Sequence, residues 1–132
     1  MNAAAQDRPG RPPLDQAVVT ALRQDFGDEA LQSFIETYID LLISRLVHID
    51  RAVGRQDCTD ALRDVPDLRT SSAMLGAGRL AKLAEALQYF LVRGMIAAAA
   101  GLLPGIRTEA AAAVAALRAV DGRRADPHPP NL

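Results

Sequence analysis

The stretch DVPDLRTSSAMLGAGRL, residues 64–80, decides how this chain folds. It has the composition of a buried helix, yet it carries a proline, Pro66, near its start. Inside a helix, proline removes a backbone hydrogen bond and clashes with the preceding turn, at a cost of about 3 kcal/mol. That cost is avoided if the helix restarts here, with Asp64 as the N-cap and Pro66 in the first turn. We therefore predict a kink or break near residues 63–66.

The rest of the composition indicates a single all-α domain. The chain has 132 residues, 49% of them hydrophobic, and much of that fraction is alanine. Alanine is the best helix former and a poor strand former. Aromatic residues make up only 4% and tryptophan is absent, which favours closely packed helices over a sheet.

Apolar residues recur at helical spacing in five segments: 14–26, 28–53, a third from Asp57 or Thr59 to about 75, 78–93, and 95–120. Short connections that contain glycine make neighbouring helices antiparallel. The predicted fold is an up-and-down antiparallel four-helix bundle, residues 14–120, with a short extra N-terminal helix. We expect Pro104-Gly105 to kink or divide the last helix, and residues 1–13 and 121–132 to be disordered tails.

Charge and cysteine content exclude several classes of protein. The formal net charge is −1, so no basic surplus favours nucleic acid or an anionic membrane. Cys58 is the only cysteine, which excludes an internal disulfide and fits the cytoplasm. The two histidines, His48 and His128, lie far from Cys58 in the sequence, so no metal-ligand cluster is predicted. We expect a soluble protein with no cofactor.

The order of helices, together with residues 66–76, resembles the histidine phosphotransfer (Hpt) domain family over roughly residues 14–120. The family motif is, loosely, His-x-Leu-Lys-Gly-Ser-small-small-x-Leu-Gly. Arg69 keeps the positive charge of the usual lysine, Thr70 replaces the glycine, and Pro66 replaces the phosphorylated histidine. The positions that match the motif are Leu68, Ser71, Ser72, Ala73, Leu75 and Gly76.

The loss of this histidine removes the family's chemistry. In a phosphorelay, a neutral imidazole nitrogen attacks an aspartyl phosphate on a receiver domain. Proline offers no nucleophile, and a serine or threonine ester would be too stable to pass the phosphoryl group on. His48, in the second helix, is expected to be a partly exposed surface histidine, with phosphorylation there as the less favoured alternative. No catalytic residue is assigned, and we do not expect an enzyme.

The resemblance implies a face that would dock the partner: Arg63, Pro66, Arg69, Thr70 and Ala73, at helical spacings of three and four. The leading hypothesis is a pseudo-phosphotransfer protein that binds a response-regulator receiver domain or a histidine kinase without carrying phosphate. The alternative is a self-associating helical scaffold, with contacts through the small-residue segments 77–87 and 110–120. We expect a monomer whose own core uses those segments, and a homodimer under the alternative.

Overall fold

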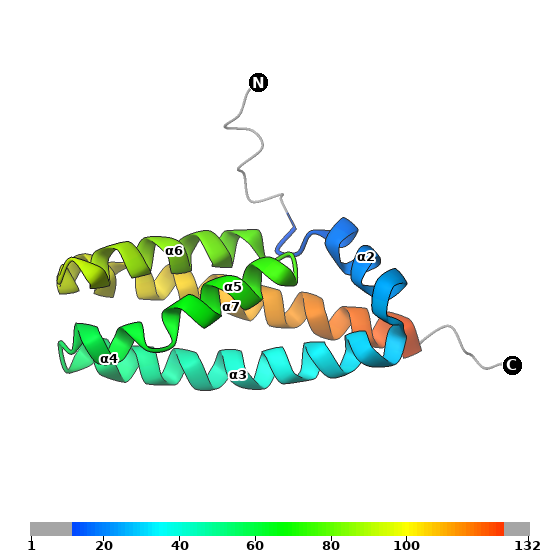
Figure 1. Ribbon diagram of the computed structural model, residues 1–132, viewed down its shortest axis with the longest axis horizontal. Helices are drawn as coiled ribbons and strands as arrows, with labels where there is room; N and C mark the ends of the chain where they lie inside the picture. Colours follow the sequence, from blue (N-terminus) through cyan, green and yellow to red (C-terminus); the bar gives the residue numbers. More distant parts are fainter. Residues whose placement is uncertain (1–11, 126–132) are drawn as a thin grey trace, which may run out of the picture.

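The computed structural model describes residues 12–125, and this part of the chain is helical without any strand. The helices, labelled in Figure 1, are α2 (Gln16–Phe26), α3 (Asp28–Gly54), α4 (Cys58–Leu62), α5 (Val65–Met74), α6 (Gly78–Val92) and α7 (Ile96–Ala125). The prediction of an all-α fold is confirmed.

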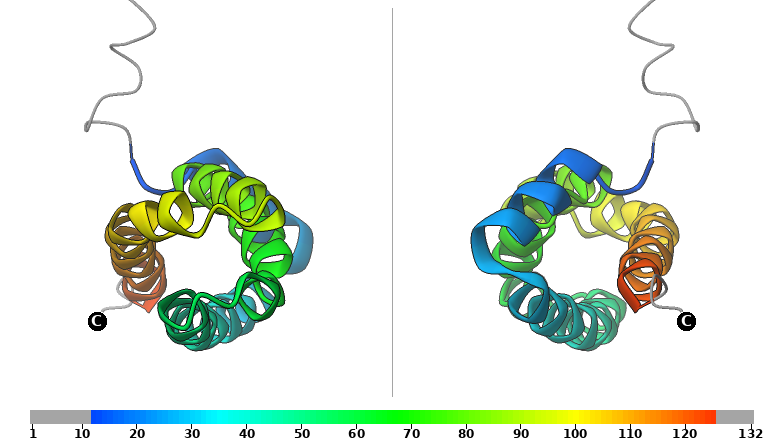
Figure 2. Two further views of the ribbon diagram at one scale, coloured as in Figure 1. Left: turned by 90° about the vertical axis from the view of Figure 1, so that its left-hand side faces the viewer. Right: turned by 90° about the vertical axis from the view of Figure 1, so that its right-hand side faces the viewer.

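Four rods surround one core: α3, the broken rod α4–α5, α6 and α7, with α2 crossing one end (Figures 1 and 2). Successive rods run antiparallel, so the predicted up-and-down four-helix bundle with an extra N-terminal helix is confirmed. The side chains that fill the core come from every rod, and the largest fully buried ones are Leu14, Ile35, Leu42, Ile49, Leu68, Leu75, Leu80, Leu87, Leu91, Ile106, Leu117 and Val19.

Helix α2 is attached to the bundle at its N-terminal end. The Asp15 carboxylate caps the helix by accepting from the Ala17 amide at 3.0 Å, and the Asp15 amide donates to the Gly76 carbonyl at 2.8 Å. A Cβ on Gly76 would lie 3.1 Å from the Asp15 carbonyl oxygen, and the φ of Gly76 is +80°. Only glycine meets both conditions without strain, which explains the glycine that follows Leu75.

The predicted break in the third segment is confirmed. Helix α4 ends at Leu62, and α5 starts at Val65 with Asp64 at the N-cap position and Pro66 in the first turn. The first helical hydrogen bond there runs from the Leu68 amide to the Asp64 carbonyl at 3.0 Å, so the missing N–H of Pro66 leaves no carbonyl unpaired within the helix. The Asp64 side chain does not cap the helix.

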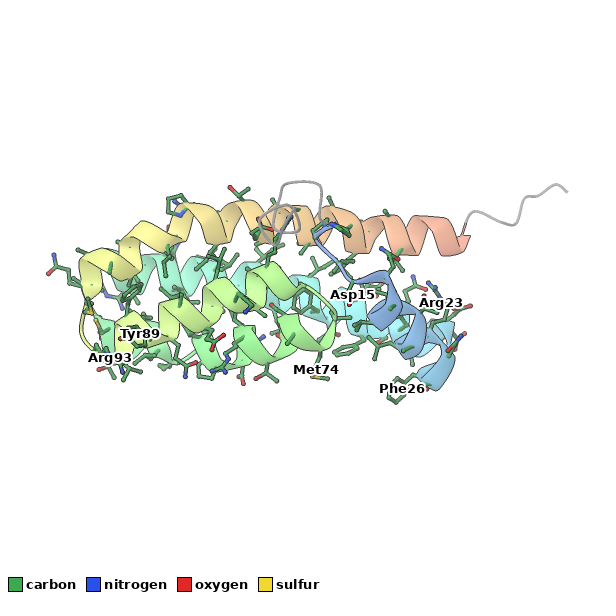
Figure 3. The ribbon with its side chains drawn as sticks, turned by 90° about the horizontal axis from the view of Figure 1, so that it is seen from above. Asp15, Arg23, Phe26, Met74, Tyr89 and Arg93 are labelled. Atoms are coloured by element: carbon green, nitrogen blue, oxygen red, sulfur yellow. The ribbon has the colours of Figure 1, made fainter. Side chains whose placement is uncertain are left out.

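Helix α7 runs through Pro104 without division, and Figure 3 shows its ribbon changing direction in the yellow part, which is the kink of the two predicted outcomes. Its end differs from the prediction, because it continues to Ala125, past residue 120. Residues 126–132 of the predicted C-terminal tail and residues 1–11 of the N-terminal tail lie outside the described residues.

By length and composition alone, the Ile96–Val120 part of α7 could cross a membrane. In the bundle, however, its large apolar side chains face the core, where Leu103, Ile106, Leu117 and Val120 are buried. Its outward face carries mainly alanine, glycine, threonine and arginine. This is the pattern of a helix that packs one face against a helical bundle.

Candidate functional site

Helix α5 has one buried side that joins it to the bundle. Val65, Leu68 and Ser72 are buried there, at spacings of three and four. The Ser72 hydroxyl lies 2.8 Å from the hydroxyl of Tyr38 on α3, and both residues are at most 2% exposed. Burial raises the pKa of the Tyr38 phenol, against the opposing effects of the Ser72 hydrogen bond and the charge of Arg45. The small serine therefore lets α5 approach α3 and gives the phenol its hydrogen-bond partner.

The opposite side of α5 and the turn before it carry the five residues predicted to dock a partner. All five are exposed: Arg63, Pro66, Arg69, Thr70 and Ala73. We call this set the α5 face. Both cations of the face have partners within the chain. Arg69 donates to the Gln88 side chain on α6 at 3.0 Å, and Arg63 donates to Asp60 at 2.9 Å. The five residues thus share one accessible surface, and their role in docking remains a prediction.

Exposed apolar side chains also occur on α5 and α6. Met74 follows Ala73 at the end of α5 and is 51% exposed, as is Tyr89 on α6. The guanidinium carbon of Arg93 lies 3.7 Å from the centre of the Tyr89 ring, a cation–π contact. In Figure 3, Tyr89 and Arg93 are labelled together at the left end of the molecule, and Met74 is labelled apart from them. The α5 face therefore has one exposed apolar side chain next to it in the chain, Met74.

The hydroxyl groups near Pro66 are poorly placed for phosphoryl transfer. Ser72 is fully buried and bonded to Tyr38, and the Ser71 hydroxyl donates to the Asp67 carbonyl at 2.7 Å. Thr70 is exposed, but no histidine lies within hydrogen-bond distance of it among residues 12–125. None of them can take the place of an imidazole at Pro66.

His48 lies at the junction of α4 and α5 rather than on an open surface. Its Nδ1 is 2.6 Å from the Asp64 carboxylate, and its Nε2 is 3.0 Å from the Asp60 carboxylate. Arg55 and Arg63 also donate to Asp60, at 2.6 and 2.9 Å. The His48 side chain is 28% exposed, which agrees with the predicted partial exposure. We call these five residues the His48 cluster.

The charges of the His48 cluster depend on one another. Hydrogen bonds to Asp64 and then Asp60 raise the pKa of His48 above its ordinary value. Partial burial acts to raise the pKa of Asp60, but the hydrogen bonds from His48, Arg63 and Arg55 outweigh it and hold that pKa below its usual value. Only an imidazolium has N–H groups for both carboxylates. Because that form has no free lone pair, the cluster disfavours His48 as a nucleophile.

The carboxylate partners of His48 were missed by reasoning from the sequence. Asp60 and Asp64 are 12 and 16 residues away, so no local pattern links them to the histidine. One signal was available, because α3 and the following rod form a hairpin that turns near Gln56. Residues at similar separations on either side of such a turn face each other, as His48 and Asp64 do.

A second surface feature lies on the other side of α3. An apolar groove of about 510 Å³ runs between α3 and α7. Ile43 and Val47 on its rim are 51% and 46% exposed, and the Arg107–Asp50 ion pair at 3.0 Å spans it. By contrast, the large apolar side chains of segments 77–87 and 110–120 that are fully buried belong to the core: Leu80, Leu87 and Leu117.

Within residues 12–125, no group of three or more histidine, cysteine, aspartate or glutamate side chains could hold a metal ion. No protein-family model matches the chain. No curated protein matches it either.

The bundle, the broken second rod and the Leu-Gly turn after α5 together define the class: in fold, the chain is an Hpt-type helical bundle. The particular structure that it resembles is the crystal structure of histidine-containing phosphotransfer protein B (HptB) from Pseudomonas aeruginosa PAO1. The TM-score is 0.80, the sequence identity is 22%, and the match covers 86% of this chain and 98% of the HptB chain. The resemblance predicted from residues 66–76 is confirmed in the fold.

Proposed function

We propose that this protein is a pseudo-histidine-phosphotransfer protein of a two-component phosphorelay. It binds a response-regulator receiver domain or a histidine kinase without carrying phosphate, and so acts as a regulator or competitor of a true relay. The observation that carries the proposal is Pro66 at the exposed start of α5, the position of the phosphorylated histidine in the motif, within an Hpt-type bundle. The role is binding rather than catalysis, and its place is the cytoplasm.

The α5 face has the chemistry for such docking. Arg69 presents a cation beside small and medium side chains, and a receiver domain offers an acidic pocket to that charge. An exposed ion pair contributes at most about 1 kcal/mol, so Arg69 adds selectivity and the surrounding contact area supplies most of the affinity. Met74, which follows Ala73 and is 51% exposed, provides apolar area next to the face.

The test is to place a large charged side chain on the face without disturbing the fold. Ala73→Arg lies on the exposed side of α5, and Ala111→Arg is the same change on the exposed side of α7. Binding is measured by calorimetry against a panel of receiver domains and kinases from the same cell. The proposal expects Ala73→Arg to weaken binding by roughly tenfold or more and Ala111→Arg to leave it unchanged. Equal binding by both variants, or no binding by the wild type, would contradict it.

The α3–α7 groove supports a second candidate, a self-associating scaffold. An apolar groove with exposed Ile43 and Val47 at its rim is a surface that a second copy could cover. Ala111 lines this groove, so Ala111→Arg would dissociate such a dimer while Ala73→Arg would not. Light scattering at high protein concentration measures this directly. A wild type that stays monomeric would exclude the scaffold.

A further inference from the structure

The α5 face starts at an interruption of the second rod. The rod is interrupted between Leu62 and Val65, and the Asp64 side chain makes no capping hydrogen bond to the new helix. Of the α5 face, Arg63 lies in this interruption and Pro66 is the second residue of the new helix. The positions of these two residues therefore depend on the contacts that join the junction to the rest of the bundle.

Besides the buried side chains of Ala61 and Val65, the junction has a polar contact to α3 through His48. Its ring spans the break, with Nε2 at 3.0 Å from Asp60 on α4 and Nδ1 at 2.6 Å from Asp64 in the turn. The carboxylates on the two nitrogens thus belong to the two sides of the interruption. A neutral imidazole has one N–H and can donate to only one of them, whereas the imidazolium donates to both.

The other charged side chains around the His48 ring do not remove the need for an imidazolium. On the α3–α4 side, Arg55 and Arg63 both donate to Asp60 and share its charge with His48. On the α5 side, Arg45 of α3 lies 3.7 Å from Asp67 and forms a separate ion pair. Among the described residues, the ion pair of Asp64 is the one with His48, so His48 supplies the cation for that carboxylate.

Resting on the function proposed above, we propose that His48 is a positioning residue for the α5 face. As the imidazolium, it hydrogen-bonds to both sides of the α4–α5 junction and holds the junction against α3. Loss of its proton makes the α5 face more mobile and weakens the docking of the partner.

The direction of the pH dependence follows from the hydrogen bonds. Both carboxylates raise the pKa of His48 above its ordinary value of 6.5. The stabilisation is therefore complete below the imidazole's unfolded pKa and is lost as pH rises through the raised pKa of the folded state. Docking should weaken on the alkaline side, by no more than about tenfold per pH unit, since a single proton is linked to it.

The experiment compares the wild type with His48→Arg, which keeps a cation beside both carboxylates at every pH, and with His48→Gln, which is neutral at every pH. Affinity for one receiver domain is measured from pH 6 to pH 9, and the ratio to the His48→Arg value removes the receiver's own titration. We expect the wild type to match His48→Arg at pH 6 and to fall toward His48→Gln at pH 9, by about threefold or more. A ratio that does not change with pH would overturn the proposal. His48→Lys replaces His48→Arg if the latter fails to fold.

A measurement without any partner separates this proposal from the proposed function. Amide hydrogen exchange of Leu68, Arg69 and Thr70 is compared between the wild type and His48→Arg at the same pH, so that intrinsic exchange rates cancel. Equal protection at pH 6 and weaker protection of the wild type at pH 8.5 support the positioning role. Equal protection at both values contradicts it. If the exchange result is positive but no receiver or kinase binds at any pH, it is the proposed docking function that fails.

Discussion

The two sides of α5 differ in what they do. The buried side, with Val65, Leu68 and Ser72, joins the helix to the bundle. The exposed side carries Pro66 where the motif that residues 66–76 resemble has its histidine, and Thr70 where it has glycine. Packing and surface chemistry can vary separately on one helix, because side chains three and four residues apart share a face. The predictions below test that separation.

The largest expected effect is on the buried side. Leu68 is 0% exposed, so Leu68→Ala should lower the free energy of unfolding by about 2–5 kcal/mol, through lost burial and the cavity that it leaves. Thr70→Ala, two residues away on the exposed side, is the matched control and should change it by less than about 0.5 kcal/mol. Urea denaturation measures both. Similar effects of the two changes would show that the sides are not energetically distinct.

A smaller effect is expected from the buried hydroxyl pair. Tyr38→Phe leaves the Ser72 hydroxyl without its partner in a buried place and should cost about 1–3 kcal/mol. The double variant Tyr38→Phe/Ser72→Ala removes both hydroxyls and should recover most of that loss. Thermal unfolding of the wild type, the two single variants and the double variant gives the coupling. Additive losses would mean that this hydrogen bond does not join α5 to α3.

The smallest change in the free energy of unfolding is expected at Pro66. The sign of that change shows whether the proline is strained in the fold. In the first turn of a helix, proline restricts the unfolded chain without straining the fold, so Pro66→Ala should destabilise by about 0.4–1 kcal/mol. A proline strained within a continuous helix would give the opposite result, a gain of about 3 kcal/mol on removal. Denaturant unfolding distinguishes the two signs.

Much of the fold was predictable because local physics controls it. Pro66 has no N–H and clashes with the preceding turn inside a helix, which favours the break after Leu62. An aspartate before an apolar stripe, as at Asp15, is a common helix cap, and it caps α2. In α3, the apolar residues at helical spacing are buried apart from Leu46, which is partly exposed: Leu31, Ile35, Tyr38, Leu42, Leu46, Ile49 and Val53. Long helices with regular apolar spacing leave little choice about which face turns inward.

The predictions that failed concern residues whose burial and partners are set by tertiary contacts. In α2, helical spacing favours Val18, Leu22 and Phe26 as the inward stripe. Phe26 is 65% exposed, however, and points away from the bundle in Figure 3, whereas Leu14 and Val19 are buried. This short helix crosses the end of the bundle, so its contacts depend on the docking of Asp15 against Gly76 rather than on its own periodicity. The His48 cluster was missed for a similar reason, since it forms only when the hairpin of α3 and α4–α5 closes.

The proposed function combines an Hpt-type fold with a surface that docks a partner and with no phosphoryl chemistry. The most direct test incubates the purified protein with phosphorylated receiver domains and follows complex formation and transferred label together. The account predicts a complex with a receiver and no label on the protein, in the wild type and in His48→Gln alike. Label on the wild type would contradict the account, and its loss in His48→Gln would identify His48 as the acceptor.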